Sequence, residues 1–163
     1  MKLKDKVVVR EFAQSDLDSA VDLVLRLKKL NGEFDSVFVV SDSARKDAED
    51  RLNQLLRNRD SHLALVAEKS GKLLGIIAIN IIDRCYYLPS KEARITDFYV
   101  MPEYRRTGAG KMLVARSYEE LKKRKITLIT AEFPSQNLIA LKFYKSLGYR
   151  EIVGIYGKVL EEE

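Results

Sequence analysis

The sequence is poor in the residues that build metal sites and disulfides. Its 163 residues contain one cysteine, Cys85, one histidine, His62, and no tryptophan. One cysteine cannot form an internal disulfide, and one cysteine with one histidine cannot supply a Cys/His metal centre. A cysteine–histidine nucleophile would need these two residues to meet in space. The sequence therefore predicts a site without a bound metal.

Long apolar runs are missing as well. No stretch reaches the roughly 18–20 apolar residues that a membrane-spanning helix needs. The first residues, Met-Lys-Leu-Lys-Asp-Lys, lack the apolar core of a signal peptide. Hydrophobic residues make up 46% and charged residues 33% of the chain, so we expect residues 1–163 to form one globular domain. Because a lone cysteine fits a reducing compartment, we expect a cytoplasmic protein.

The formal charge of +5 does not by itself indicate a nucleic-acid partner. The most basic run, residues 122–125, lies at the expected end of a helix, where cations complement the helix dipole. The other lysines and arginines are scattered among 24 acidic residues, with no basic stripe interleaved with aromatic residues. We therefore expect neither a nucleic acid nor a membrane as the main partner.

Hydrophobic periodicity predicts strands and helices that alternate along the chain. Helices are expected over residues 15–32, from 41 or 43 to 57, 108–123 and 135–147, and strands over residues 7–12, 63–67, 73–82, 94–100, 126–133 and 149–160. Hairpins in the middle are followed by a βαβαβ tail. This order predicts an α/β fold: one mixed, mainly antiparallel sheet flanked by helices.

Residues 100–113 are the most informative stretch. A strand end is followed by a turn with two arginines and two glycines, and then by an amphipathic helix, which is the layout of an anion cradle. A nucleoside-triphosphate loop would need glycine at Arg105 and a hydroxyl at Met112. A dinucleotide fingerprint would need glycine at Leu113 and an N-terminal βαβ unit. Both nucleotide loops are therefore excluded.

The remaining pattern, Arg-x-x-Gly-x-Gly at 105–110 after a strand ending Val-x-Pro, resembles the coenzyme A pyrophosphate loop of the GCN5-related N-acetyltransferase (GNAT) superfamily. Residues 137–149 resemble that family's second signature, Asn-x-x-Ala-x-x-Phe-Tyr followed by Gly-Tyr. The resemblance is strong over residues 94–157 and only topological before them. It implies the acyl-CoA N-acyltransferase fold with a splayed strand pair, and acetyl-CoA as the co-substrate.

The resemblance also implies how coenzyme A is held. The backbone N–H groups of residues 106–111 and the helix dipole would neutralise the pyrophosphate, and the two arginines would add charge. The splayed strand would bind the pantetheine arm as an added strand does. The implied binding residues are Phe98, Tyr99, Val100, Arg105, Arg106, Thr107, Gly108, Ala109, Gly110, Lys111, Asn137, Ala140 and Tyr144.

Acetyl transfer to an amine needs a base for the amine and an acid for the departing thiolate. Tyr144 occupies the family's acid position and is the best acid candidate; the alternative is a core tyrosine that packs against Phe143 and Tyr149. Glu92 falls where bacterial ribosomal-protein acetyltransferases place their catalytic glutamate, and Asp97 falls where spermidine/spermine acetyltransferases carry an acidic residue. A regular strand places these two carboxylates on opposite faces unless a bulge intervenes.

The resemblance leaves the acceptor open between a small, polyamine-like primary amine, which Asp97 slightly favours, and a peptide or protein amine. With no cysteine in a plausible acyl-carrier position, we expect direct transfer in a ternary complex. The alternative is a non-catalytic coenzyme A-binding or interaction module on the same fold. A homodimer formed by edge pairing or strand exchange at the C-terminus is a further expectation.

Overall fold

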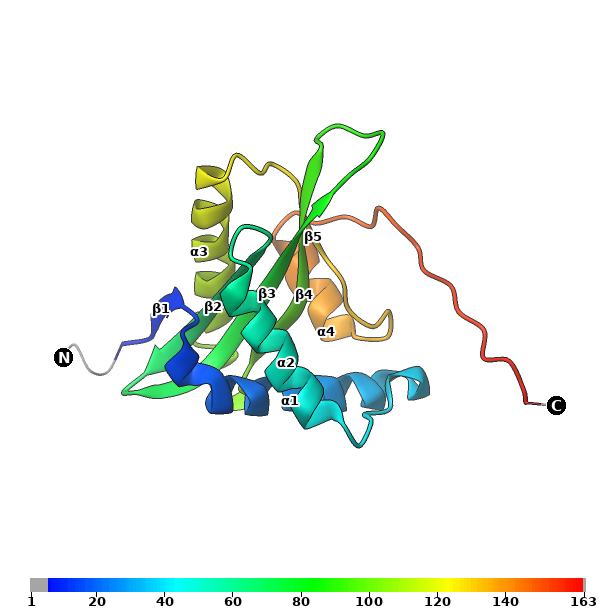
Figure 1. The fold of residues 1–163 in the computed structure, drawn as a ribbon, viewed down its shortest axis with the longest axis horizontal. Helices are drawn as coiled ribbons and strands as arrows, with labels where there is room; N and C mark the ends of the chain where they lie inside the picture. Colours follow the sequence, from blue (N-terminus) through cyan, green and yellow to red (C-terminus); the bar gives the residue numbers. More distant parts are fainter. Residues whose placement is uncertain (1–5, 163) are drawn as a thin grey trace.

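The computed structural model describes residues 6–162, and its centre is a five-stranded sheet with the order β1-β2-β3-β4-β5 (Figure 1). Neighbouring strands are antiparallel from β1 to β4, and β5 joins parallel to β4. This confirms the mixed, mainly antiparallel sheet. The strands are β1 (Val8–Glu11), β2 (His62–Lys69), β3 (Lys72–Asp83), β4 (Lys91–Val100) and β5 (Ile129–Ala131).

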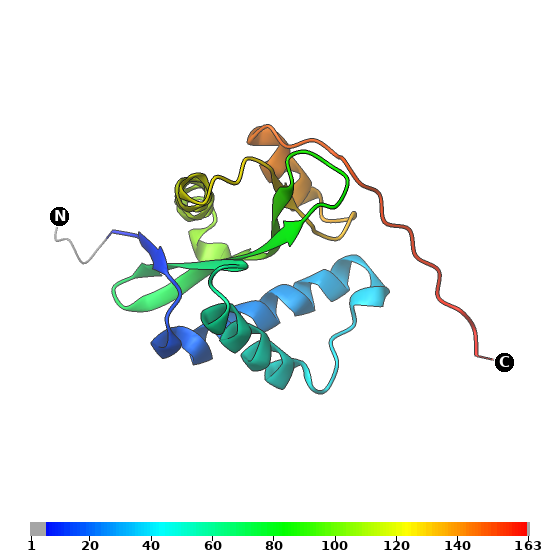
Figure 2. The ribbon, with the colours of Figure 1, turned by 45° about the horizontal axis from the view of Figure 1, so that its top comes forward.

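Helices cover both faces of the sheet. Figure 2 shows α1 (Leu17–Phe34) and α2 (Ala44–Arg57) on one face, and α3 (Ala109–Lys123) and α4 (Leu138–Ser146) on the other. Short 3₁₀ turns lie at Gln14–Asp16 (η2), Ser36–Phe38 (η3) and Pro102–Tyr104 (η4). Since β3 is covered on both faces, it is buried from Leu73 to Ile79 and forms the middle of the core.

Two helix ends differ from the sequence prediction for identifiable reasons. The first helix does not end at Gly32 but continues to Phe34. A Cβ at Gly32 would lie 3.1 Å from the carbonyl oxygen of Phe38, so this glycine permits a close approach of η3 rather than a helix stop. The fourth helix begins at Leu138 instead of residue 135, because Asn137 caps it by accepting a hydrogen bond from the N–H of Ala140 at 3.1 Å.

The strand predicted over residues 149–160 is not formed. Gly148, with a φ of 87°, ends α4, and Tyr149 still packs against the body. Residues 150–162, hereafter the C-terminal arm, run outward as an extended and exposed segment (Figures 1 and 2). The apolar pattern predicts a strand correctly only where a neighbouring strand is available, and within residues 6–162 none pairs with the arm.

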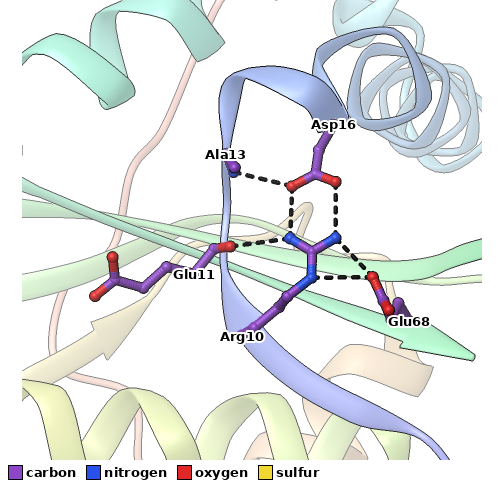
Figure 3. Close-up of polar contacts among 5 residues, drawn as sticks. All are labelled: Arg10, Glu11, Ala13, Asp16 and Glu68. Atoms are coloured by element: carbon purple, nitrogen blue, oxygen red, sulfur yellow. Dashed lines mark hydrogen bonds and ion pairs between the residues drawn. The ribbon is translucent and has the colours of Figure 1, made fainter. Parts of the chain in front are cut away.

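Arg10 on β1 connects the first strand to two other segments (Figure 3). Its guanidinium donates to both carboxylate oxygens of Asp16 at 2.7 and 2.8 Å, and to Glu68 on β2 at 2.6 and 2.9 Å. Asp16 also accepts from the N–H of Ala13 at 2.9 Å. The hydrogen bond from Arg10 outweighs the opposing effect of burial and holds the pKa of Asp16 below its usual value. This network fixes the turn from β1 into α1.

We expect Asp16→Asn to lower the free energy of unfolding at pH 7 by about 1.5–3 kcal/mol, because Arg10 loses a charged acceptor. The pKa of Asp16 is lowered in the folded state, so its contribution is present above about pH 4 and is lost as the pH falls through the folded-state pKa. Urea unfolding at pH 7 and below pH 4 measures this, and the difference between wild type and variant should shrink at the lower pH. Asp22→Asn, which breaks the exposed pair with Arg45, is the control and should leave the midpoint unchanged. Equal effects of the two substitutions would contradict the prediction.

Candidate active site

The strands β4 and β5 separate after a short parallel pairing. β4 pairs with β3 from Lys91 to Val100, whereas its pairing with β5 covers only Ala93 to Ile95. Beyond Ile95, the β5 side of residues 96–100 has no strand partner within the described chain. β4 and β5 therefore form the splayed strand pair that the resemblance implies.

The register identifies which backbone groups of β4 face the open side. Met101 donates to the carbonyl of Leu74 at 2.8 Å, so the backbone groups of residues 97, 99 and 101 point toward β3. Those of Phe98 and Val100 therefore point the other way. The Val100 carbonyl accepts from Nε of Arg105 at 2.9 Å, which leaves the Val100 N–H and both groups of Phe98 facing the open side.

The helix α3 begins close to this edge, and its N-terminus has no side-chain cap. Its N-cap residue, Gly108, has a φ of 85°, which favours glycine, and no acidic residue lies in the first turn. The first N–H groups of the helix have no intrahelical acceptor and carry the positive end of the dipole. The Thr107 hydroxyl donates back to the Tyr104 carbonyl at 2.6 Å and does not occupy them. This N-terminus can bind an anion.

Two residues of the loop make contacts with β4. A Cβ at Gly110 would lie 3.2 Å from the ring of Phe98, so this glycine brings α3 against β4. Arg105 lies along the end of β4, with its guanidinium carbon 5.5 Å from the ring centre of Tyr99. Arg106 is exposed and keeps its charge at the surface of the loop.

Tyr144 lies in an aromatic cluster on the α3/α4 side of β4. It is only 5% exposed, and its ring centre lies 5.1–5.3 Å from those of Phe133, Phe143 and Tyr149 and 6.3 Å from that of Phe98. Burial raises the pKa of Tyr144 far above its usual value. Its hydroxyl is therefore protonated at neutral pH, so it can donate a proton but cannot serve as a base.

A bulge in β4 changes the expected placement of the two carboxylates. Ala78 pairs with Asp97 and Ile79 pairs with Ile95, so Thr96 is an extra residue in β4. The extra residue reverses the alternation and brings Glu92 and Asp97 to the same face. The opposite-face placement expected for a regular strand is wrong for this reason.

Contacts with the helices identify this face as the one covered by α1 and α2. Lys28 of α1 forms an ion pair with Asp97. Arg51 of α2 donates to Asn80, which is the register partner of Arg94 and lies on the same side. Glu92 and Asp97 are nevertheless four β3 positions apart, or about 13 Å at 3.3 Å per residue.

Neither carboxylate is free of partners. Glu92, which is 8% exposed, accepts hydrogen bonds from Thr130 of β5 and from Arg94 at 2.9 Å, and Arg84 lies 4.0 Å away. Burial acts to raise the pKa of Glu92, but the bonds from Thr130 and Arg94 and the two positive charges outweigh it and lower the pKa. Asp97, equally buried, is held by Lys28.

The partners of these carboxylates could not be found from the sequence. Lys28 lies 69 residues from Asp97, and Thr130 lies 38 residues from Glu92. Neither stands in a motif, so only the fold brings each pair together.

Other sequence alternatives can be placed in the same way. Cys85 is exposed in the hairpin between β3 and β4, while the His62 ring is bound by Ser61 and Asn58, so the two do not form a nucleophilic pair. Among residues 6–162, no group of three or more His, Cys, Asp or Glu is placed to hold a metal ion. No helix in this part of the chain is long and apolar enough to cross a membrane.

Comparison with known proteins places this geometry in one family. The model of the acetyltransferase (GNAT) family matches residues 27–149. An uncharacterized N-acetyltransferase of Methanocaldococcus jannaschii is 27% identical over 147 residues, which cover 88% of this chain and 60% of that protein. The ribosomal protein bS18-alanine N-acetyltransferase of Escherichia coli is 35% identical over 60 residues, which cover 37% of this chain and 40% of that protein.

The fold has a solved counterpart as well. The crystal structure of a predicted acetyltransferase with acetyl-CoA from Clostridium acetobutylicum matches with a TM-score of 0.77 at 19% identity, covering 94% of this chain and 96% of that one. This likeness establishes the fold. Against the two curated relatives, by contrast, the matched segment spans less than two thirds of their own length.

Proposed function

This chain belongs to the acetyltransferase (GNAT) family, and we propose that it is an N-acetyltransferase that moves an acetyl group from acetyl-CoA directly to a primary amine. One observation carries the proposal: the unpaired edge of β4 at Phe98 and Val100 leads to the uncapped N-terminus of α3. The extended pantetheine chain of coenzyme A, which ends in a pyrophosphate, matches these two features together. We treat residues 1–163 as one N-acetyltransferase domain, of which residues 1–5 and 163 lie outside the described structure.

We assign the donor site to the residues that the sequence nominates, with changes of role. The N–H groups of residues 106–111 bind the pyrophosphate, and Arg106 and Lys111 supply charge. The open backbone groups of Phe98 and Val100 bind the pantetheine arm, whereas the backbone of Tyr99 belongs to the ladder with β3. The remaining members of the set shape the site, since Arg105 holds the end of β4 and Asn137 with Ala140 starts α4 beside the loop.

The chemistry follows from the two faces of β4. The amine approaches from the α1/α2 face, where the carboxylates lie, and its nitrogen forms a bond to the thioester carbonyl carbon as the C–S bond breaks. The amine proton passes to a carboxylate, directly or through water. Tyr144, on the opposite face, donates its proton to the departing thiolate. Backbone N–H groups of the open edge stabilise the oxyanion that develops on the carbonyl oxygen.

The charges on the acceptor face favour a peptide or protein amine over a polyamine. A polyamine needs unpaired carboxylates for its second charge, but Asp97 already faces Lys28 and Glu92 already faces Arg94 and Arg84. In the sequence, Asp97 slightly favours a polyamine acceptor. In the fold, the cations beside Asp97 and Glu92 offset this preference. The bS18-alanine N-acetyltransferase of Escherichia coli is named for an amine of this second class.

Three further parts of the proposal rest on the sequence and stay predictions. They are the absence of a metal from the reaction, a location in the cytoplasm, and a main partner that is neither a nucleic acid nor a membrane. We also propose a homodimer. The extended and exposed C-terminal arm supports it, because the arm has no strand partner within residues 6–162.

The deciding experiment is an amine panel with detection of the free coenzyme A thiol and mass analysis of the products. The panel contains polyamines, amino acids, peptides with a free N-terminus and peptides with a lysine side chain. We expect thiol release only when an amine acceptor is present, with a peptide amine as the better substrate. If acetyl-CoA binds but no amine gives turnover, the non-catalytic coenzyme A-binding module becomes the correct reading.

Tyr144→Phe should lower kcat by at least about 100-fold, because the departing thiolate loses its proton donor while the aromatic packing is kept. Single-turnover kinetics with the best acceptor measures the chemical step. Tyr149→Phe is the matched control, since it removes a hydroxyl from the same cluster, where that hydroxyl bonds only to Tyr118 at 2.9 Å. An unchanged rate for Tyr144→Phe would remove the acid role.

Asp97→Asn should lower kcat/KM more than Glu92→Gln at pH 7, because Asp97 adjoins Phe98 and the open edge, whereas Glu92 lies before the segment paired with β5. The loss should shrink as the pH approaches the amine pKa of about 10, where the amine loses its proton to solvent. Rate profiles between pH 6 and pH 10 measure both effects, and thermal unfolding checks that each variant is folded. A larger loss with high-pH recovery for Glu92→Gln would transfer the base role to Glu92.

A further inference from the structure

Lys28 places a primary amine beside the carboxylate that we expect to act as the base. Its Nζ forms an ion pair with Asp97, and its side chain remains 43% exposed, so the amine is not sealed in the core. Glu92 differs, because its cationic partners are Arg94 and Arg84. A guanidinium keeps its proton in proteins and is therefore no nucleophile. Among the cations that face these two carboxylates, Lys28 is the one with the chemistry of an acceptor.

The helix that carries Lys28 crosses the sheet toward its open side. Asp16, directly before α1, binds Arg10 of β1, and further along the helix Lys28 meets Asp97 of β4. In both views α1 continues past β4 (Figures 1 and 2). Asp97 precedes Phe98, whose backbone groups face the side of β4 that has no strand partner among residues 6–162. The amine thus lies on the acceptor side of β4, next to the segment to which we assign the pantetheine arm.

We propose that this chain acetylates its own Lys28 at Nζ when acetyl-CoA is bound and no other amine fills the acceptor position. The inference rests on the proposed function, since the same donor, base and acid serve both kinds of acceptor. Acetylation converts the ammonium into a neutral amide, so Asp97 loses the positive charge that it faces in the unmodified chain.

The step has the balance of an ordinary acetyl transfer. The Lys28 ammonium gives a proton to Asp97, which passes it to water, and the neutral nitrogen forms a bond to the thioester carbonyl carbon as the C–S bond breaks. Tyr144 protonates the departing thiolate, and the second proton that the nitrogen loses replaces it through solvent. The products are acetyl-Lys28, coenzyme A and one proton in water. Because Lys28 is itself the amine acceptor here, thiol release without an added amine stops at one equivalent per chain.

Mass analysis of the full chain before and after incubation with acetyl-CoA alone tests the proposal. We expect a gain of one acetyl group per chain, located at Lys28 by peptide mapping, at a rate that does not change when the protein is diluted. Lys28→Arg keeps the charge and should gain no acetyl group at this position. Asp97→Asn should slow the gain by at least about 10-fold. Lys29→Arg, at the neighbouring exposed residue of α1, is the matched control and should be acetylated at Lys28 as the wild type is.

The urea-unfolded chain under the same conditions measures the direct chemical reaction of lysines with the thioester. Acetyl groups spread equally over exposed lysines, a rate that rises with protein concentration, or an undiminished rate in Asp97→Asn would overturn the proposal. An unmodified Lys28 in a preparation that releases thiol with an added amine would overturn it as well, and the proposed function would then stand. If Lys28 stays unmodified and no amine of the panel gives turnover although acetyl-CoA binds, both fail together.

Discussion

The unequal pairing of β4 is the constraint on which the site depends. A strand inside a sheet normally forms backbone hydrogen bonds with two neighbouring strands. β4 pairs with β3 along its full length but with β5 only at Ala93 to Ile95. Its last residues keep their geometry because the β3 ladder holds them, while their other side is free for a ligand. The unpaired end of β4 also leads to the N-terminus of α3. One strand therefore offers an edge to an extended ligand chain and leads to a helix end that can bind an anion.

The bulge at Thr96 sets the second property of this strand. A regular β4 would present Glu92 and Asp97 to opposite layers, and one of them would lie among the apolar side chains beneath α3 and α4. With one residue inserted, both carboxylates meet the cations of the α1/α2 layer, while Phe98 still packs against Gly110 and Phe143 on the other side. The two layers therefore act on different groups: burial on the α3/α4 side raises the pKa of Tyr144, and on the α1/α2 side the hydrogen bonds from Thr130 and Arg94 and the charges of Arg94 and Arg84 lower the pKa of Glu92.

How much the sequence predicts depends on the range of the interaction. The element order up to the fourth helix, the hairpin at residues 69–72 and the start of α3 follow from local patterns, and the structure bears them out. The bulge leaves no local signal, because Thr96 is an ordinary residue for a strand. The ion pair of Lys28 with Asp97 joins residues far apart in the sequence, so the charge balance of the acceptor face could not be predicted. The contacts of Gly110 with Phe98 and of Arg105 with the Val100 carbonyl also depend on how α3 and its loop pack against β4.

The failed strand at residues 149–160 differs from these cases, because its residues are extended and exposed from Arg150 on but no strand among residues 6–162 pairs with them. The splay that opens β4 to a ligand also directs β5 away after Ala131, so the sheet ends in a strand of three residues with free backbone groups. A strand added at that edge lies next to Thr130, whose hydroxyl donates to Glu92. The opening to which we assign the donor site therefore lies beside a sheet edge, the outer side of β5, that no strand covers among residues 6–162.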